Sequence, residues 1–215
     1  MGVPHPTIHG DPMTTLAAPL RPRAVLAEAV LPQSLTRTGV TVGLGALITA
    51  LAAQVALPIP GSPVPVTGQT FAVLLVGAAL GPARGVASMA LYLVLGAVGL
   101  PVFTDASGGA HVLLGATGGY LVGFLAAAAI AGHAARRGHD RSVLRELTVA
   151  VAASLTIYVV GVGWLALSTG MSLGAAIGAG MLPFLLGDAL KALLAAGALP
   201  GAWKVVGALD SRPDA

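Results

Sequence analysis

Two ionisable side chains, Asp188 and Lys191, stand three residues apart in an otherwise apolar stretch near the end of the chain. In a helix this spacing places both on one face. Charged groups in apolar surroundings face a cavity or each other, because burying a lone charge is costly. The carboxylate can accept hydrogen bonds from a ligand's N–H groups, and the ammonium can donate to carbonyl or carboxylate oxygens. The pair therefore predicts a site for a polar ligand.

Two other interpretations of this charged pair stay open. It could be an ion pair that only fixes helix packing, or one step of a proton relay. A relay usually needs a chain of titratable groups, and the apolar stretches contain no further acid except Glu146 at the end of one of them. The ligand site is therefore favoured.

Four further polar side chains stand where they could join the charged pair. Gln69 begins one apolar stretch directly after a proline-rich segment, and Tyr120 lies near the start of another. Ser107 belongs to a loop, and Tyr92 lies in the middle of a third apolar stretch. We predict that these residues line the same site, and for each alone the alternative is ordinary packing or a solvated loop.

The composition defines the surroundings of these residues. The chain has 215 residues, of which 9% are charged and 56% are hydrophobic, with a mean hydropathy of +0.89. A typical soluble domain has roughly a quarter of its residues charged, and disorder requires low hydrophobicity. Both classes are excluded, so we expect a membrane protein. The absence of cysteine excludes disulfides and thiolate metal sites.

Six stretches are apolar enough to be membrane helices, which need about 20 residues to cross about 30 Å of hydrocarbon. These stretches are 38–57, 69–80, 85–102, 112–133, 146–168 and 183–206. We therefore expect an all-α, polytopic protein with six transmembrane helices.

The basic residues orient these helices. Ten of the 11 Lys and Arg residues fall on one side of a six-span arrangement, and the eleventh is Lys191. The opposite loops, 58–68, 103–111 and 169–182, contain none. Because cytoplasmic loops are enriched in Lys and Arg, both termini are predicted to be cytoplasmic. This rule explains the net charge of +3, and no basic stripe with interleaved aromatic residues indicates a nucleic-acid partner.

Three regions are expected along the chain. They are a flexible cytoplasmic N-terminal tail over 1–36, the membrane domain over 37–207 and a cytoplasmic C-terminal tail over 208–215. Six prolines lie within the first 35 residues and no long apolar run precedes Arg21, so no cleavable signal is expected. A short interfacial helix is expected across 24–31, and Met13 is an alternative start.

The apolar stretch 69–80 is too short to cross a bilayer alone. Its 12 residues span roughly 18 Å as a helix. The proline-rich loop 58–68 before it cannot be helical in its interior, and irregular backbone at membrane depth is tolerated only inside protein or beside a cavity. We therefore expect this loop to fold over or into an outward-facing pocket. A plain extracellular loop beside a tilted short helix is the alternative.

Small residues recur at four-residue intervals. Gly119 and Gly123 form such a pair in one stretch, and Ala46 and Ala50 form another near the N-terminus. Such pairs permit close helix contact. We expect tight packing throughout, with Ala46 and Ala50 on a face suited to a partner helix.

Motifs for catalysis or ATP binding are missing. The chain contains no G-x-x-x-x-G-K-[ST], no H-E-x-x-H and no G-x-S-x-G sequence. We therefore expect no enzyme activity, no metal and no direct use of ATP.

Five short runs, in this order and spacing, resemble the BioY family. They are PVPVTGQTF (63–71), LGPARG (80–85), GLPVF (99–103), LGATGGY (114–120) and LGDALK (186–191). The resemblance implies a biotin-binding substrate-specific (S) component of an energy-coupling factor transporter. It also implies six helices in the bacterial cytoplasmic (inner) membrane and high-affinity biotin capture and uptake without a cofactor. The expected partners are a transmembrane coupling protein and two ATP-binding subunits.

The resemblance also suggests roles for the candidate residues. Asp188 would accept hydrogen bonds from the ureido N–H groups of biotin, and Lys191 would meet its ureido carbonyl or its carboxylate. The remaining residues fall into three groups. Gln69, Tyr120 and Ser107 would make other polar contacts and Tyr92 would wall the apolar rings; Pro63, Val64, Pro65 and Thr67 would form a lid; Ala46 and Ala50 would contact the coupling subunit.

Three alternatives remain beside this interpretation. The chain could be an S component for another vitamin, an intramembrane enzyme or a structural membrane subunit without a ligand. Saturable biotin binding by the purified chain would exclude the last two.

Overall fold

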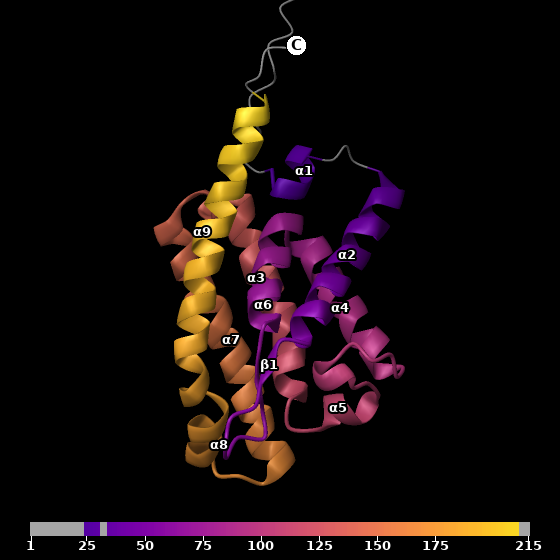
Figure 1. Cartoon of the computed structure of the whole chain (residues 1–215), viewed down its shortest axis with the longest axis vertical. Helices are drawn as coiled ribbons and strands as arrows, with labels where there is room; N and C mark the ends of the chain where they lie inside the picture. Colours follow the sequence, from indigo (N-terminus) through magenta and orange to yellow (C-terminus); the bar gives the residue numbers. More distant parts are fainter. Residues whose placement is uncertain (1–23, 31–33, 211–215) are drawn as a thin grey trace, which may run out of the picture.

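The structure, a computed structural model, describes residues 24–30 and 34–210 and is built almost entirely of helices (Figure 1). The longer helices are α2 (Leu35–Ala53), α3 (Gln69–Leu80), α4 (Pro82–Ala97), α6 (Gly118–Arg136), α7 (Val143–Thr169) and α9 (Leu185–Asp210). The shorter ones are α1 (Leu26–Val30), α5 (Ala110–Leu114), α8 (Leu173–Gly180), η1 (Thr104–Ala106), η2 (His139–Arg141) and η3 (Leu182–Phe184). The predicted all-α class is confirmed. Among the described residues, the strands are β1 (Ala56–Leu57) and β2 (Val66–Thr67), which pair antiparallel.

Within the described residues, four helical stretches are long and apolar enough to cross a membrane. They are Leu35–Ala53, Gly118–Arg136, Val143–Thr169 and Leu173–Leu209, the last of which runs through α8 and α9. Helices α3 and α4 are also apolar but have only 12 and 16 residues. Each of the six expected stretches overlaps one of these helices, but 112–133 begins in α5 and 38–57 continues past α2 into β1.

The helix boundaries differ from the expected ones where glycine and proline redirect the chain. Helix α4 begins at Pro82, because proline suits the first helical turn and Gly81 supplies the left-handed turn before it (φ 81°). The same helix ends at Ala97 rather than at residue 102. Gly99, at φ 102°, and Pro101 follow its end and direct the chain into a loop.

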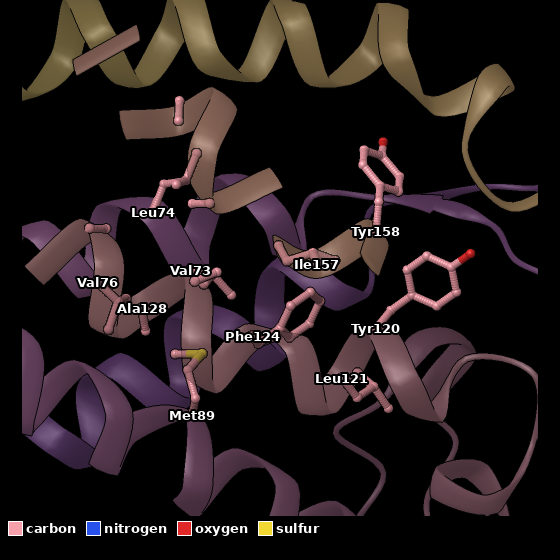
Figure 2. Packing of buried hydrophobic residues seen from close by; sticks show 14 of the residues in the cluster. Val73, Leu74, Val76, Met89, Tyr120, Leu121, Phe124, Ala128, Ile157 and Tyr158 are labelled. Atoms are coloured by element: carbon pink, nitrogen blue, oxygen red, sulfur yellow. The ribbon is translucent and has the colours of Figure 1, made fainter. Parts of the chain in front are cut away.

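Helix α6 lies at the centre and packs against α3, α4 and α7. Figure 2 shows Phe124 of this helix between Val73 and Ile157, with Tyr120 and Tyr158 toward one end of the cluster. Glycines allow the close approach: a Cβ atom on Gly123 would lie 3.1 Å from the backbone of Ile157. The tight packing expected from the small-residue pairs is confirmed at this helix pair.

Helix α1 covers the end of the short helix α3, between α2 and α9 (Figure 1). Val25, just before α1, is fully buried in a small cluster with Ala78, Ala135 and Leu199. Glu28 of α1 forms ion pairs with Arg136 at 3.0 Å and with Arg84 at 3.9 Å. Residues 24–30, expected within a flexible tail, therefore pack against the other helices in the structure, and 26–30 are helical.

The remainder of the expected tails lies mostly outside the described residues. Residues 1–23, 31–33 and 211–215 are not described. The interfacial helix expected across 24–31 corresponds to α1, and α9 continues to Asp210, beyond the predicted end of the membrane domain. The three-region division itself stays a prediction.

Candidate ligand-binding site

A cavity of about 230 Å³ lies between α3, α6, α7 and α9, beneath the loops that follow α2 and α4. Its wall combines aromatic and aliphatic side chains with a small group of polar ones, as is typical of ligand pockets. The lining residues are Val64, Pro65, Thr67, Gln69, Thr70, Phe103, Thr104, Asp105, Ser107, Val112, Thr117, Tyr120, Leu121, Phe124, Ile157, Tyr158, Phe184, Asp188 and Lys191.

The charged pair of α9 lies in this wall. Lys191 Nζ is 3.0 Å from Asp188 Oδ1, and the two side chains are 15% and 11% exposed. Lys191 Nζ also donates to the Thr70 hydroxyl oxygen at 2.9 Å, and that hydroxyl donates to Asp188 Oδ1 at 3.3 Å. The Tyr158 hydroxyl donates to the other carboxylate oxygen, Oδ2. Asp188 is thereby held from three helices.

This network leaves binding capacity for a ligand. An ammonium has three N–H donors, and Lys191 uses two of them on Asp188 and Thr70. Helix α3 begins at Gln69, so its N-terminal end, with its partial positive charge, lies at the cavity. The polar end of the cavity can therefore accept N–H groups at Asp188 and offer a donor to a carbonyl or carboxylate oxygen.

Gln69 lines the cavity and is itself firmly held. Its Nε2 donates to the Tyr92 hydroxyl at 2.6 Å, and its Oε1 accepts a hydrogen bond from the Thr67 hydroxyl at 2.9 Å. Tyr92 does not line the cavity. It lies behind Gln69, and its ring packs edge-on against Phe103 with the ring centroids 5.3 Å apart. Tyr92 thus supports the wall rather than forming it.

The other predicted polar residues also reach the cavity. Tyr120 lines it and donates its hydroxyl to the Gly180 carbonyl at 2.8 Å, which ties α6 to the end of α8. Ser107 lines it and donates to the Thr104 carbonyl at 2.7 Å. Both hydroxyls remain free to accept one further hydrogen bond from a ligand.

The β1–β2 pair, in which Leu57 is opposite Val66, joins the two ends of the loop that contains the expected lid segment. Val64, Pro65 and Thr67 of this segment line the cavity, whereas Pro63 does not and is exposed.

The structure corrects the predicted partner face of α2. Ala46 is only 3% exposed and belongs to the protein's own core, and Ala50 is partly buried against the same core. A small-residue pattern marks a close helix contact, but here the contact is internal, because α2 packs against α3 and α4 of the same chain. The small residues on the open side of α2 are Gly39 and Gly43, where a Cβ atom would have no neighbour within 4 Å.

Tyr158 and Gln54 are two of the residues at the site that the sequence interpretation missed. Tyr158 is one of only three tyrosines, and a tyrosine inside an apolar stretch needs a partner for its hydroxyl, which was a usable signal. Gln54, just after α2, donates from Nε2 to the Phe103 carbonyl and accepts from the Ala106 N–H, each at 3.0 Å. It thereby fixes the second loop over the cavity.

The chemistry of this site is that of binding. Across residues 24–30 and 34–210 there is no group of three or more His, Cys, Asp or Glu side chains that could hold a metal ion. A cavity with aromatic and aliphatic walls and one charged, hydrogen-bonded end suits a small amphipathic molecule.

The long apolar helices and this cavity define a multi-pass membrane protein that binds a small solute. The BioY family model matches residues 22–208, and the chain belongs to the BioY family. The family consists of transport components and not of enzymes.

Individual proteins agree with this assignment. The chain is 41% identical over 137 residues to a "Probable biotin transporter BioY" of Pyrococcus horikoshii, covering 64% of this chain and 79% of the relative. It is 44% identical over 106 residues to the "Biotin transporter BioY" of Thermotoga maritima, covering 49% and 62% respectively. A crystal structure described as the S-component for biotin from an ECF-type ABC transporter superposes with a TM-score of 0.69 and 26% identity, over 80% of this chain and 95% of that one.

Proposed function

We propose that this protein captures biotin with high affinity and takes it up across the bacterial cytoplasmic membrane as the S component of an energy-coupling factor transporter. The observation that carries this proposal is the network of Asp188, Lys191, Thr70 and Tyr158 at one end of a cavity whose wall also contains aromatic and aliphatic side chains. The family membership and the names of the relatives support it.

The chemistry of biotin fits the two parts of the cavity. Biotin has two ureido N–H donors, a ureido carbonyl, an apolar bicyclic body and a carboxylate at the end of an alkyl chain. Asp188 accepts from the ureido N–H groups through charge-assisted bonds. Lys191 donates to an oxygen of the ligand, and Phe124, Ile157 and Phe184 cover the apolar body.

For the topology, we propose six membrane crossings by α2, α3, α4, α6, α7 and α9, with both termini cytoplasmic. The asymmetric distribution of Lys and Arg supports this arrangement. Helix α3 spans only about 18 Å, but α1 covers one end of it and the loop before β2 leads into the other. Helix α1 and the loop before β2 thus fill the part of the membrane thickness that the short helix α3 does not span.

The energy for uptake comes from other chains in this proposal. The sequence has no P-loop, so we propose as partners a transmembrane coupling protein and two ATP-binding subunits. The proline-rich loop 58–68 acts as the lid, because it covers the cavity and returns to it through β2.

The test is a binding experiment with two ligands and two proteins. Biotin and its amide, which lacks the carboxylate, are titrated into the purified wild-type chain and into Lys191→Gln. If Lys191 meets the carboxylate, the amide binds weakly to wild type and the variant no longer distinguishes the two ligands. If Lys191 meets the ureido carbonyl, the variant weakens both ligands alike.

Two outcomes would contradict the proposal. A lack of saturable biotin binding by the folded wild-type chain rules out biotin capture. Tighter binding of another vitamin than of biotin assigns the cavity to that vitamin instead.

A further inference from the structure

A second hollow, a groove of about 430 Å³, opens between the end of α6 and the beginning of α7. It lies at the opposite end of these helices from the ligand cavity, which uses the start of α6. The floor of the groove is apolar and made largely of small side chains. Ile130 and Ala134 contribute from α6, and Val149 and Ala152 from α7.

The rim of the groove is polar and basic. His133 and Arg137 at the end of α6, and His139 in the turn that follows, lie on one side, and Thr148 of α7 lies on the other. His133 Nδ1 is 2.9 Å from the Ala129 carbonyl oxygen, which holds its ring along the helix. His133, Arg137 and Thr148 are exposed.

No acidic side chain is among the described residues that line the groove. Asp140 comes directly after His139, but its side chain is fully buried and accepts a hydrogen bond from Trp203 of α9. Glu146 is also buried, at 1% exposure. The positive charge of the rim is therefore not balanced by a surface acid in its wall.

The arginines of this region differ in how they are engaged. Arg136 pairs with Glu28, and Arg141 stacks over the Trp203 ring at 4.2 Å. Arg137 forms no ion pair with any residue in 24–30 or 34–210. Since an arginine is permanently charged and suits phosphate geometry, Arg137 is the arginine in the groove lining that is available to an external anion.

We propose that this groove binds an anionic phospholipid, with the phosphate at Arg137 and His139 and one acyl chain over the apolar floor. The groove begins at the end of two helices long enough to span a membrane, which is the depth of lipid headgroups. Large apolar side chains of the same two helices, Val122 and Leu155, are about half exposed, as a lipid-facing surface requires. Basic pockets between membrane helices at this depth suit anionic headgroups.

A soluble anion matches the groove less well than a lipid does. Free phosphate would use the basic rim alone and leave the apolar floor uncovered. A lipid covers both parts at once. The apolar floor therefore favours a phospholipid over free phosphate.

The first test compares two single-charge changes in the full-length protein. Arg137→Gln removes the rim cation, and Arg145→Gln removes an exposed cation of the same region that does not line the groove. Delipidated protein is mixed with equal amounts of phosphatidylglycerol and phosphatidylcholine, and the lipid retained is measured by native mass spectrometry. We expect the preference for phosphatidylglycerol to fall about fivefold in Arg137→Gln and to persist in Arg145→Gln. Equal losses in both variants would mean diffuse surface attraction and would overturn the site.

The second test changes the floor without changing charge. Ala152 is exposed, so Ala152→Leu fills the groove without disturbing the core. We expect it to reduce retention of phosphatidylglycerol several-fold while leaving any thermal shift caused by inorganic phosphate unchanged. If Ala152→Leu retains lipid as wild type does, or if inorganic phosphate displaces the lipid completely at millimolar concentration, the anion site exists without a lipid and the proposal is wrong.

Discussion

The Tyr158 hydroxyl on α7 donates a hydrogen bond to Oδ2 of Asp188 on α9, the carboxylate oxygen that Lys191 does not contact. Because Lys191 and Thr70 occupy Oδ1, both oxygens of this carboxylate are engaged before a ligand arrives. The orientation of Asp188 is thus set by two neighbouring helices as well as by its own. A binding group fixed in this way loses little conformational entropy when a ligand docks.

Tyr158→Phe is expected to weaken biotin binding on the order of tenfold while leaving the fold intact. The variant keeps the ring in the wall but removes the hydrogen bond that orients the Asp188 carboxylate. A hydrogen bond to a charged group contributes about 1.5–3 kcal/mol to the stability of the arrangement it holds. Isothermal titration of purified protein measures the change. Trp164→Phe on the same helix is the matched control, because Trp164 Nε1 donates to the Gly115 carbonyl and this residue does not line the cavity. Equal losses in both variants would assign the effect to general packing.

Asp188→Asn is expected to weaken biotin binding more strongly than Tyr158→Phe. The amide replaces an ionic acceptor with a neutral one. It also leaves Lys191, whose side chain is only 15% exposed, without its counter-charge. Binding and the melting temperature are measured on the same samples. Undiminished affinity together with a lower melting temperature would favour the interpretation of a purely structural ion pair.

Gln54→Ala is expected to loosen the loop over the cavity. This loop contains two non-glycine residues at positive φ, Asp105 at 57° and Ala106 at 50°. Such backbone conformations persist only where the surroundings hold them. Gln54 binds the Phe103 carbonyl before them and the N–H of Ala106 itself. Hydrogen exchange of the Ala106 and Ser107 amides should accelerate in the variant. Unchanged exchange would show that other contacts hold the loop.

Biotin is expected to restrict the motion of the proline-rich loop. The chain has no cysteine, so a single spin label can be attached at an exposed Pro60→Cys. Ser62 is less suitable, because its hydroxyl donates to the Val64 carbonyl and accepts from the Val64 N–H. A label at Gly174→Cys on the exposed face of α8 serves as the control. Equal mobility of the Pro60 label with and without saturating biotin would place the gate in loop 103–111 instead.

Asp140 gives the protein a specific pH dependence. Burial raises the pKa of this carboxyl, even though Trp203 Nε1 donates to it at 2.6 Å. The folded state therefore holds its proton to higher pH than the unfolded chain, in which the pKa is about 3.9. Its contribution to stability is greatest below about pH 4 and is lost as the pH rises through the folded-state pKa.

Asp140→Asn removes this titration and keeps an oxygen for Trp203. We expect the melting temperature of wild type to fall relative to that of Asp140→Asn as the pH is raised from about 4. Calorimetry at several pH values measures the difference. Parallel curves for the two proteins would show that Asp140 has the same pKa in both states.

The sequence was sufficient to locate the longer helices, because hydropathy and the positions of glycine and proline are local properties. Helix α8 was not predicted, since it lies within 169–182, which was expected to be a loop. The stretch 69–80 was predicted with the bounds that α3 has in the structure. The packing of α1 was not predicted, since it depends on Val25 meeting residues from α3, α6 and α9. A five-residue helix in a proline-rich segment carries no sign of these distant contacts.

The same difference applies to the candidate site: a pair of residues within one helix could be predicted from the sequence, and a contact between two helices could not. Asp188 and Lys191 were found because their spacing places them on one face of a single helix. The link from Asp188 to Tyr158 joins two helices across 30 residues of sequence, and spacing within one segment cannot predict it. The assignment of Ala46 to a partner surface was wrong for a related reason: a small-residue pattern identifies a close contact but not the helix on the other side.

The pairing of Asp188 with Lys191 also has an electrical consequence. Their opposite charges cancel, so this pair leaves the carboxylate of bound biotin uncompensated. Movement of biotin together with this pair across the membrane then carries one net negative charge. Against an inside-negative voltage, that step costs about 2.3 kcal/mol per 100 mV. Delivery of the anion is therefore electrogenic and uphill in voltage, and hyperpolarisation slows it unless a second energy source drives it.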